Sequence, residues 1–539
     1  MRVLCGALAC LASSAQAQVF CVPIDRIDVT GTTLISPMQV EAALAEFEGH
    51  CLGMEQINAA LEAVTFLYVD RGYITARAYL PEQDIADRSL DITVVEGTLA
   101  EVRFDGETRP VWQQITFPGL IGRPANLREI EQGLDIIRGM PSYNASMEIT
   151  AGAAEGESIL DVSTEVPKRW TGRVGANNFG TPKQGEYNGY VDLTYDHLLG
   201  LNETWSLTVS RAAEANPFTA ESGGAATESA TLGLRMPYGR WTLNGSYQYS
   251  YYETATLGAI ESIGTDGWTQ TADLGLARVV HRNQDSKTTL SAALNWRDNV
   301  NRIAEIQINA SSRTLASARI DIDHERSLWG GGLSMRLGYE QGLDAFGAEV
   351  YSGTGPDPQF ELVDFELRYG RAWQREAGNI SFNTTLRGQW SEDMLHSPYR
   401  IGIGGQSSVR GVKVWNSEYE EETEPGVTKR SNVGLFTGDT GLVWRNDMSW
   451  TTKVPLPRLF GSLQTYAGLD AGIVDFDDDG AAKAVSGTAI GLRTVGSTVS
   501  VDLAWQRLLD IYEQTDPGDP FSPVLDPDGI FLLSVSASF

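Results

Sequence analysis

One arginine set among glycines is the residue whose surroundings most suggest a chemical role. The segment from Gly404 to Gly411 reads Gly-Gly-Gln-Ser-Ser-Val-Arg-Gly, and Arg410 is its permanently charged group. Gly404, Gly405 and Gly411 allow a positive φ angle and close approach of the backbone, which suits a structured loop tip that places a cation. On this segment alone, the simpler interpretation is a surface loop whose arginine is solvated.

No other group of residues has the spacing of an active site. The sequence contains neither a Gly-x-Ser-x-Gly elbow nor a phosphate-binding loop. The run from Asp475 to Gly480 opens like a calcium loop, but its twelfth position is Ser486 instead of glutamate, which favours a solvated turn. The histidines outside the cysteine region are scattered without metal-ligand spacing: His197, His281, His324 and His396. We therefore expect no enzyme activity, no cofactor and no metal site.

The first residues have the pattern of a secretory signal peptide. Arg2 precedes an apolar stretch from Val3 to Leu11, and Ala15-Gln16-Ala17 is a small-x-small cleavage site. The pattern predicts a signal peptide over residues 1–17. A lipoprotein signal through Cys10 is the alternative, but the apolar run before that cysteine is very short.

Removal of the signal peptide leaves two cysteines, Cys21 and Cys51, which enter an oxidising compartment together. We expect a disulfide between them, which would stabilise the N-terminal domain by roughly 3–4 kcal/mol in the chain-entropy model. A metal site on the same pair is the alternative, but His50 is the only histidine nearby.

Size and charge narrow the classes of function. The chain has 539 residues, which is too long for a single compact core. Lys and Arg total 41 against 70 Asp and Glu, and the net charge of −29 opposes binding of nucleic acid. After the N-terminus no apolar run reaches the length of a transmembrane helix, so a membrane role would require a β-barrel.

Two small α+β units are predicted before the barrel. In residues 22–97, Ile57, Leu61, Val64 and Tyr68 recur at helical spacing between extended segments. The following residues, 98 to about 167, repeat this plan. There Asn126 and Glu129 have the spacing of a capping box at the start of a helix.

After Trp170 the chain changes to segments of about ten alternating residues, which are typical of outer-membrane barrels. We count about sixteen of them, the last ending on the terminal aromatic residue Phe539. A soluble all-β protein would show the same alternation, but the signal peptide and the aromatic end favour the membrane. One segment shows the two faces, with Ile380, Phe382, Leu386 and Trp390 toward lipid and Ser381, Asn383, Arg387 and Gln389 toward the lumen. The alternation stops over residues 391–437, a segment far longer than a normal connection between strands.

Several motifs together resemble the hemolysin secretion and activation family of two-partner secretion transporters. The matches in the first two units are Arg71–Arg77, Leu80–Ile85, Val95–Gly97, Phe117-Pro118 and Leu127–Leu134, with Ala151-Gly152 in place of the usual Pro-Gly. The matches in the barrel are Asn177–Gly180, Gly185, Leu199–Leu201, Val409–Gly411 and Gly438–Gly441, with Val412 in place of the usual aromatic residue.

The resemblance implies an organisation of the whole chain. Residues 18–97 and 98–167 would be two polypeptide-transport-associated (POTRA) domains, and residues 168–539 a transmembrane antiparallel β-barrel. The long loop 391–437 would fold back into the lumen, where Asp470 holds Arg410, with Gly472 on the same face leaving space. The lock would then comprise Gly404, Gly405, Val409, Arg410, Gly411, Asp470 and Gly472.

The resemblance also implies a function. The chain would sit in the outer membrane of a Gram-negative bacterium as a monomer in contact with lipid, with its POTRA domains in the periplasm. It would recognise one secreted partner there, a large β-helical adhesin or hemolysin-like protein, and pass it unfolded through the barrel without nucleotide. An outer-membrane protein insertion and assembly factor is the main alternative, because it shares the POTRA domains, the barrel and the Arg-Gly loop. A plain porin would not explain residues 22–167, and a hydrolase would lack a nucleophile and base.

Overall fold

The computed structural model describes most of the chain, and the fold is established for those residues. They are 21–180, 185–214, 216–218, 225–257, 262–353, 355–411, 419–424, 427–431, 436–452, 457–475, 482–496, 498–513 and 529–539. The expectations for the signal peptide, for Val412 and for the turn after Asp475 lie outside the described residues.

Contacts within the chain divide it into two compact units. The first unit runs up to Arg109 and includes Gly119–Glu131 and Ser146–Ser163, whereas the second contains Pro110–Pro118, Gln132–Ala145 and Thr164–Phe539. This division differs from a simple cut after residue 167. The expected domain boundaries remain predictions.

A three-stranded sheet and two helices form the N-terminal part of the first unit. The sheet has the order β2-β5-β4, from β2 (Arg26–Thr30), β5 (Ser89–Val95) and β4 (Arg77–Tyr79). Helices α1 (Pro37–Leu44) and α2 (Met54–Asp70) supply Leu44, Val64 and Tyr68 to the core, all of them buried. The buried residues of α2 recur at helical spacing, as the sequence pattern predicts.

A short ribbon carries the disulfide. Strand β1 (Val22–Ile24) pairs antiparallel with β3 (His50–Leu52), which places Pro23 opposite Cys51. The Cys21 and Cys51 side chains are joined by a disulfide, as the cysteine count predicts. The bond therefore ties the start of this unit to the connection between its two helices.

Glu96 directly follows β5 and forms hydrogen bonds with several segments of the same unit. Its carboxylate accepts hydrogen bonds from the Leu34 N–H at 2.8 Å, from the Tyr68 hydroxyl at 3.0 Å, and from both the N–H and the hydroxyl of Thr33. Burial alone would raise the pKa of Glu96, but the bonds from Thr33, Leu34 and Tyr68 outweigh burial and lower it below the ordinary value. The Glu96 carboxylate thus joins a loop, a helix and a strand.

The second sheet has the order β6-β8-β7, from β6 (Thr98–Phe104), β8 (Glu157–Glu165) and β7 (Asn144–Ala151). The helices between β6 and β7 are α3 (Pro110–Thr116) and α4 (Leu127–Arg138). Asn126 accepts a hydrogen bond from the Arg128 N–H at 2.9 Å, while the Glu129 side chain pairs with Arg123 instead of returning to the cap. The capping box predicted from the sequence is therefore only half formed.

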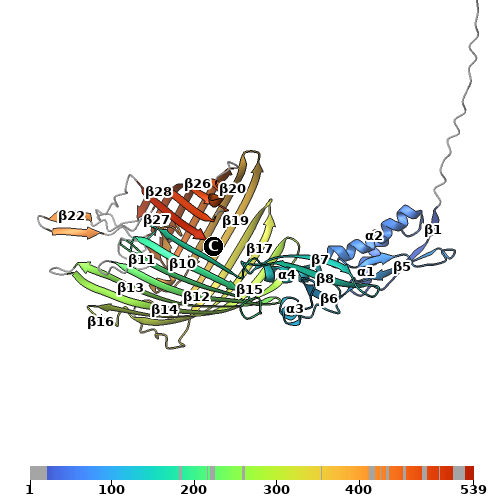
Figure 1. Cartoon of the computed structure of the whole chain (residues 1–539), viewed down its shortest axis with the longest axis horizontal. Coiled ribbons are helices and arrows are strands. Elements are labelled where there is room, and N and C mark those ends of the chain that lie inside the picture. Colours follow the sequence, from blue (N-terminus) through green and yellow to red (C-terminus); the bar gives the residue numbers. More distant parts are fainter. Residues whose placement is uncertain are drawn as a thin grey trace, which may run out of the picture. The chain divides into compact units, whose positions relative to one another are not determined.

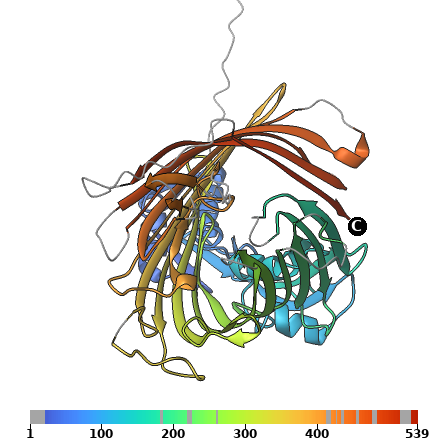
Figure 2. The same ribbon diagram turned by 90° about the vertical axis from the view of Figure 1, so that its left-hand side faces the viewer.

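The rest of the chain is a closed antiparallel barrel of sixteen long strands, which confirms the predicted fold class (Figures 1 and 2). In order along the chain they are β9 (Trp170–Asn177), β10 (Tyr187–Asp196), β11 (Thr204–Ala213), β12 (Ala226–Tyr238), β13 (Trp241–Leu257), β14 (Ser262–Arg282), β15 (Ser286–Ile303), β17 (Arg313–Leu328), β18 (Gly331–Gly342), β19 (Glu361–Arg375), β20 (Gly378–Trp390), β25 (Thr440–Thr452), β26 (Ser462–Asp475), β27 (Ala482–Val495), β28 (Val499–Glu513) and β29 (Ile530–Ser538). A two-residue strand, β16 (Ile306–Gln307), pairs at the end of β15, and a short helix, η2 (Arg458–Phe460), precedes β26.

The barrel closes where its last strand meets its first. Strand β29 pairs antiparallel with β9, and the backbones of Phe539 and Gly172 exchange two hydrogen bonds of 2.9 Å. The Phe539 ring packs edge-on against Trp170 at 5.8 Å between centroids. The terminal aromatic residue thus secures the seam at its end.

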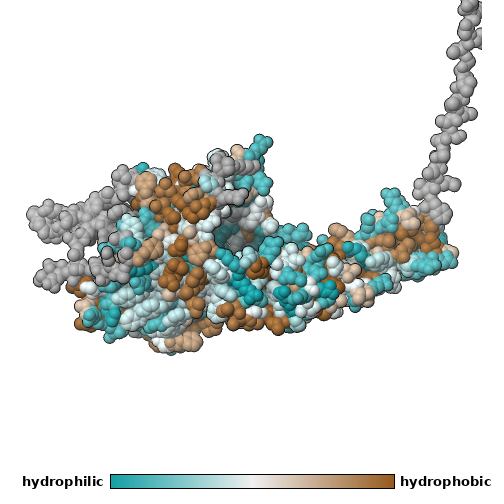
Figure 3. Space-filling model, viewed as in Figure 1, coloured by the Kyte–Doolittle hydropathy of each residue, from teal (hydrophilic) through white to brown (hydrophobic). Residues whose placement is uncertain are grey.

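Apolar side chains gather on the outer wall of the barrel (Figure 3). Exposed residues of this kind occur along strands from β10 to β29, and include Leu193, Leu207, Leu232, Leu274, Leu294, Ile320, Leu337, Trp444, Ile473, Leu492, Leu503 and Leu533. On β20, Trp390 is exposed, whereas the neighbouring Gln389 contacts the long loop. This alternation gives one face suited to lipid and one suited to a wet lumen.

The second unit also contains contacts between helical segments and the barrel turns. Asp135 of α4 forms an ion pair with Arg282 at 2.6 Å, and the Ser142 N–H donates to Asp196 at 2.8 Å. In the turn after β10, the carboxylate of Glu203 accepts the N–H groups of Leu199 and Leu201, which shapes the predicted Leu-Gly-Leu turn. No helix in the described part of the chain is long and apolar enough to cross a membrane.

Candidate functional site in the barrel lumen

The long segment between β20 and β25 contains regular structure that the sequence did not predict. Strand β21 (Ile401–Ile403) pairs antiparallel with β24 (Phe436–Gly438) and joins the two arms of the loop. The remaining elements are η1 (Ser397–Tyr399), β22 (Tyr419–Glu424) and β23 (Val427–Ser431). The tip discussed below comprises residues 404–411, which follow β21 directly.

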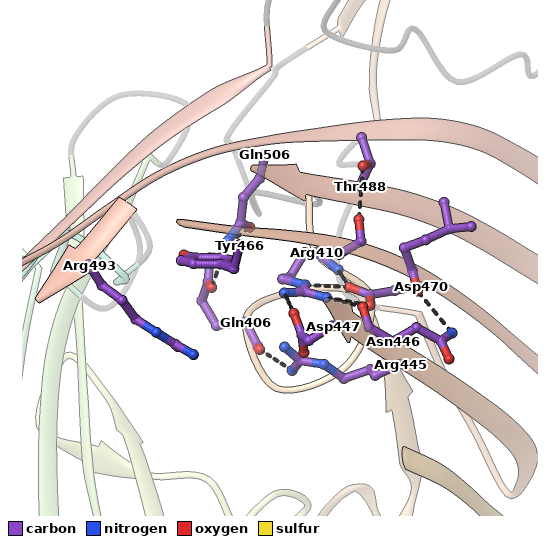
Figure 4. A network of polar contacts seen from close by, with 12 residues as sticks. Gln406, Arg410, Arg445, Asn446, Asp447, Tyr466, Asp470, Thr488, Arg493 and Gln506 are labelled. Carbon is purple, nitrogen blue, oxygen red and sulfur yellow. Dashed lines mark hydrogen bonds and ion pairs between the residues drawn. The ribbon is translucent and has the colours of Figure 1, made fainter. Parts of the chain in front are cut away.

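Arg410 at this tip is held by two carboxylates on the barrel wall (Figure 4). Its Nε and Nη2 atoms donate to the two oxygens of Asp470 on β26, at 2.6 and 2.7 Å. Its Nη1 atom donates to Asp447 on β25 at 2.6 Å, and its backbone N–H donates to Asp470 at 3.1 Å. Two parallel bonds from one guanidinium to one carboxylate fix direction as well as distance.

The pair of Arg410 and Asp470 is buried, and burial determines how much free energy is lost when one member is removed. Arg410 is 4% exposed and Asp470 is 1% exposed. Removal of one member from such a pair leaves an uncompensated charge in a medium of low dielectric constant, at a cost of roughly 3–5 kcal/mol. Either residue alone is therefore unfavourable in this position, and the lock depends on both.

Apolar contacts beside the pair keep the site dry and place it on the inner wall. Val409 is fully buried in a cluster with Ile401 and Ile403 of the loop. The cluster also contains wall residues from four adjacent strands: Val443, Val474, Val485 and Leu508. The opposite face of the same strands carries the exposed Trp444, Ile473 and Leu492, so the loop lies on the lumen side.

Small residues on the wall make the close approach possible. A Cβ atom added at Gly468 would lie 2.0 Å from Nη2 of Arg410, and one at Gly487 would lie 1.8 Å from its carbonyl oxygen. A Cβ at Gly472 would lie 3.0 Å from a methyl group of Val409. Gly411 itself has φ +92°, and a Cβ there would meet the backbone of Arg507. Glycine is therefore required on both sides of this contact.

A pair of amides provides a further attachment of the tip. The side chains of Gln406 and Gln506 donate to one another at 2.9 and 3.0 Å, and the Gly411 N–H also donates to Gln506 at 3.2 Å. Arg445 on β25 donates to the Gln406 carbonyl at 2.5 Å. The tip is thus attached to β25, β26 and β28 together (Figure 4).

The structure brings most of the predicted lock residues together and adds several that the sequence did not indicate. Gly404 and Gly405 adopt φ angles of +109° and +87°. Asp447, Gln506 and Gly487 were missed by sequence reasoning. The period-2 pattern offered one signal, since Asp447 follows Arg445 by two residues and thus shares its face.

No group of His, Cys, Asp and Glu within the described ranges could hold a metal ion. The carboxylates of Asp470 and Asp447 are both paired with the Arg410 guanidinium, an arrangement that can hold a loop in place. We call the buried ion pair of Arg410 and Asp470, together with the neighbouring Asp447, the latch.

Family models match almost the whole described chain. The model described as haemolysin secretion/activation protein ShlB/FhaC/HecB matches residues 156–419 and 432–494. A ShlB-type POTRA model matches residues 22–97, and a second POTRA model matches residues 98–151.

Relatives agree with these models in sequence and in fold. The outer membrane transporter CdiB of Dickeya dadantii is 30% identical over 92% of this chain and 85% of its own length. The hemolysin transporter protein ShlB of Serratia marcescens is 27% identical over 93% of this chain and 84% of its own length. The solved structure of CdiB from Escherichia coli has a TM-score of 0.84, with 28% identity over 98% of this chain and 92% of that chain.

Proposed function

The chain belongs to the haemolysin secretion/activation family, and from this premise we propose that it exports one secreted partner protein through a lumen that its long loop controls. It is an outer-membrane transporter of a two-partner secretion system, with POTRA domains in the periplasm. The observation that carries the proposal is the buried latch between Arg410 and Asp470, because a loop fixed inside a barrel obstructs passage until it is released.

The partner is proposed to be a large secreted protein of the adhesin or hemolysin kind that crosses the barrel unfolded. Support comes from the relatives, one of which is named as a hemolysin transporter. No nucleotide is required in this proposal, because folding of the partner outside the cell can supply direction. We also propose that the chain acts as a monomer and has no catalytic activity.

An exposed strand edge is proposed as the site that recognises the partner. Each edge strand of the first sheet has one main-chain N–H already bonded to a side chain: the Ile27 N–H on β2 donates to Glu48 and the Ala78 N–H on β4 donates to the Thr65 hydroxyl, both at 3.1 Å. Strand β7 has eight residues and lies at an edge of the second sheet. An extended segment of the partner can add to such an edge through main-chain hydrogen bonds.

Deletion of the gene distinguishes this function from the assembly-factor alternative. We expect one large protein to disappear from the culture medium, while the other barrel proteins of the outer membrane keep their levels. Quantitative mass spectrometry of medium and outer membrane, with a complemented strain as control, measures both quantities. Simultaneous loss of many barrel proteins from the membrane would instead identify an assembly factor.

The same secreted protein then serves to test the recognition edge. A photo-crosslinking amino acid at position 148 on β7 should capture it during export, whereas one at position 26 on β2 should not. Capture at position 26 alone would place recognition on the first sheet and contradict the assignment to β7.

A further inference from the structure

The loop has a second polar attachment at its base, separate from the latch at its tip. Asp439 directly precedes β25 and is 1% exposed. Its carboxylate accepts a hydrogen bond from the Leu395 N–H at 3.0 Å and forms an ion pair with Arg400. Nε of Arg400 lies 2.9 Å from one Asp439 oxygen and donates to the Leu395 carbonyl, while Nη2 donates to the other Asp439 oxygen at 3.5 Å. The Gln389 amide on β20 donates to the Tyr399 carbonyl at 2.7 Å and to the Asp439 carbonyl at 3.0 Å. We call this group the base anchor.

Apolar packing reinforces the base anchor. Leu395 is fully buried in a cluster with Phe360 and Leu362, and Tyr399 packs against it. The rings of Phe360 and Tyr399 lie 4.3 Å apart between centroids. The base of the loop is therefore attached to the chain that leads into β19 as well as to β20 and β25.

The segment between the two attachments contains a candidate hinge. Residues of β21 pair with β24 and continue the base as a small ribbon, and Gly404 and Gly405 follow it immediately. Both have positive φ angles, and a Cβ added at Gly405 would meet nothing within 4 Å. The Ser408 hydroxyl donates to the Gly404 carbonyl at 2.7 Å, so the tip itself is a compact turn.

We infer that Asp439 and Arg400 are positioning residues that keep the base of the loop in place while the tip, residues 404–411, swings about Gly404 and Gly405. This inference rests on the proposed function. It specifies which part of the loop must move for the partner to pass and which part stays. A tip that remains tethered to a fixed base also returns to its site as an intramolecular event, which favours reclosing after export.

The polar contacts of the two attachments have no residue in common, although Val409 of the tip packs in one apolar cluster with Ile401 and Ile403. Among the described residues, the base anchor uses Leu395, Arg400, Gln389 and Tyr399, whereas the tip uses Asp470, Asp447 and Gln506. Attachments without shared partners contribute additively to stability, while members of one attachment do not. Changes in the base anchor should therefore add to changes in the latch.

Two engineered disulfides test which part moves. The first pairs Gly402→Cys with Thr437→Cys, which are register partners across the base ribbon. Gly402 lines a lumen cavity of about 330 Å³, so a side chain there has room. The second pairs Val409→Cys with Gly472→Cys, where the added Cβ would lie 3.0 Å from a Val409 methyl group, within reach of a disulfide.

Export of the secreted partner is measured for each variant with its disulfide oxidised and after mild reduction, and bond formation is checked by non-reducing electrophoresis. We expect the variant with the oxidised disulfide in the base ribbon to export as much partner as its reduced form. The variant with the oxidised disulfide at the tip should lose export, and reduction should restore it. Wild type with and without reductant controls for the native Cys21–Cys51 bond.

Loss of export in the variant with the oxidised base-ribbon disulfide would contradict the inference that the base stays fixed. Full export in the variant with the oxidised tip disulfide would contradict the inference that the tip moves. Failure of the proposed function would look different, because wild type itself would export nothing. A double-mutant cycle of Asp439→Asn and Arg410→Ala gives a second test. The fold-loss of export in the double variant should equal the product of the fold-losses in the two single variants. A double variant no worse than Arg410→Ala would contradict independent attachments.

Discussion

Arg410 and Glu96 perform the same physical task in different parts of the chain, because each is a single charged group that joins several segments. Arg410 donates to Asp470 and Asp447, and Glu96 accepts from Thr33, Leu34 and Tyr68. Hydrogen bonds to a charged group contribute roughly 1.5–3 kcal/mol each, more than neutral ones. Residues of this kind dominate local stability.

Glu96 gives a pH-dependent prediction. Its pKa is lowered in the folded protein, so its contribution to stability is complete above the pKa of the unfolded chain, near 4.3, and is lost as pH falls through the folded value. At neutral pH, Glu96→Ala should therefore accelerate hydrogen exchange at the Thr33 and Leu34 amides by at least about tenfold, from the loss of roughly 2 kcal/mol. The difference from wild type should shrink in acid.

Exchange is measured by mass spectrometry on the full-length protein, with Glu62→Ala on the exposed face of α2 as a matched control. Equal protection of the Thr33 and Leu34 amides in wild type and Glu96→Ala at neutral pH would show that the carboxylate does not hold this loop.

At the level of elements, strands β26 and β27 present glycine at three positions that the loop approaches closely: 468, 472 and 487. A methyl group at position 487 would lie 1.8 Å from the Arg410 carbonyl. Gly487→Ala should therefore displace the tip without changing any charge, with a strain of about 1–3 kcal/mol. The expected result is a loss of export similar in direction to that of Arg410→Ala.

Gly275→Ala on β14 is the matched control, because the added Cβ would be no closer than 3.5 Å to any neighbour. Export of the partner and heat-modifiable migration of the barrel are measured together for both variants. If Gly487→Ala exports like Gly275→Ala, close packing of the tip against β27 is not required.

The sequence predicted elements well where periodicity is long and poorly where it is short. Alternation in segments of about ten residues identified the barrel and about sixteen strands, which the structure confirms. Strands β1, β3, β21 and β24 have three residues each and were missed, because so few positions cannot show a period. The predicted capping box at Asn126 is only half formed for another reason, because the Glu129 side chain pairs with Arg123 instead.

For the whole molecule, periodicity alone could not give the position of the loop. Alternation distinguishes two faces of a strand but does not say which side of the wall a long connection takes, and that expectation came from the family resemblance. The pairing of Arg410 with Asp470 came from the same source. Asp447 belongs to a strand segment that no motif covered, so the period-2 pattern could place it on the same face as Arg445 but could not connect it to the loop.

The account as a whole depends on the latch acting as one unit that is needed for export and not for assembly. In a double-mutant cycle, Arg410→Ala, Asp470→Ala and the double variant should insert into the outer membrane at wild-type levels. Because each single change already prevents the tip from returning to its locked position after export, all three should export the partner to a similarly reduced level.

The decisive measurement is therefore the amount of secreted partner in the medium for these three variants, normalised to folded barrel in the same cells. The account predicts that the loss in the double variant equals that of either single variant. A loss in the double variant equal to the full sum of the two separate effects would show that Arg410 and Asp470 act independently, and would contradict the latch.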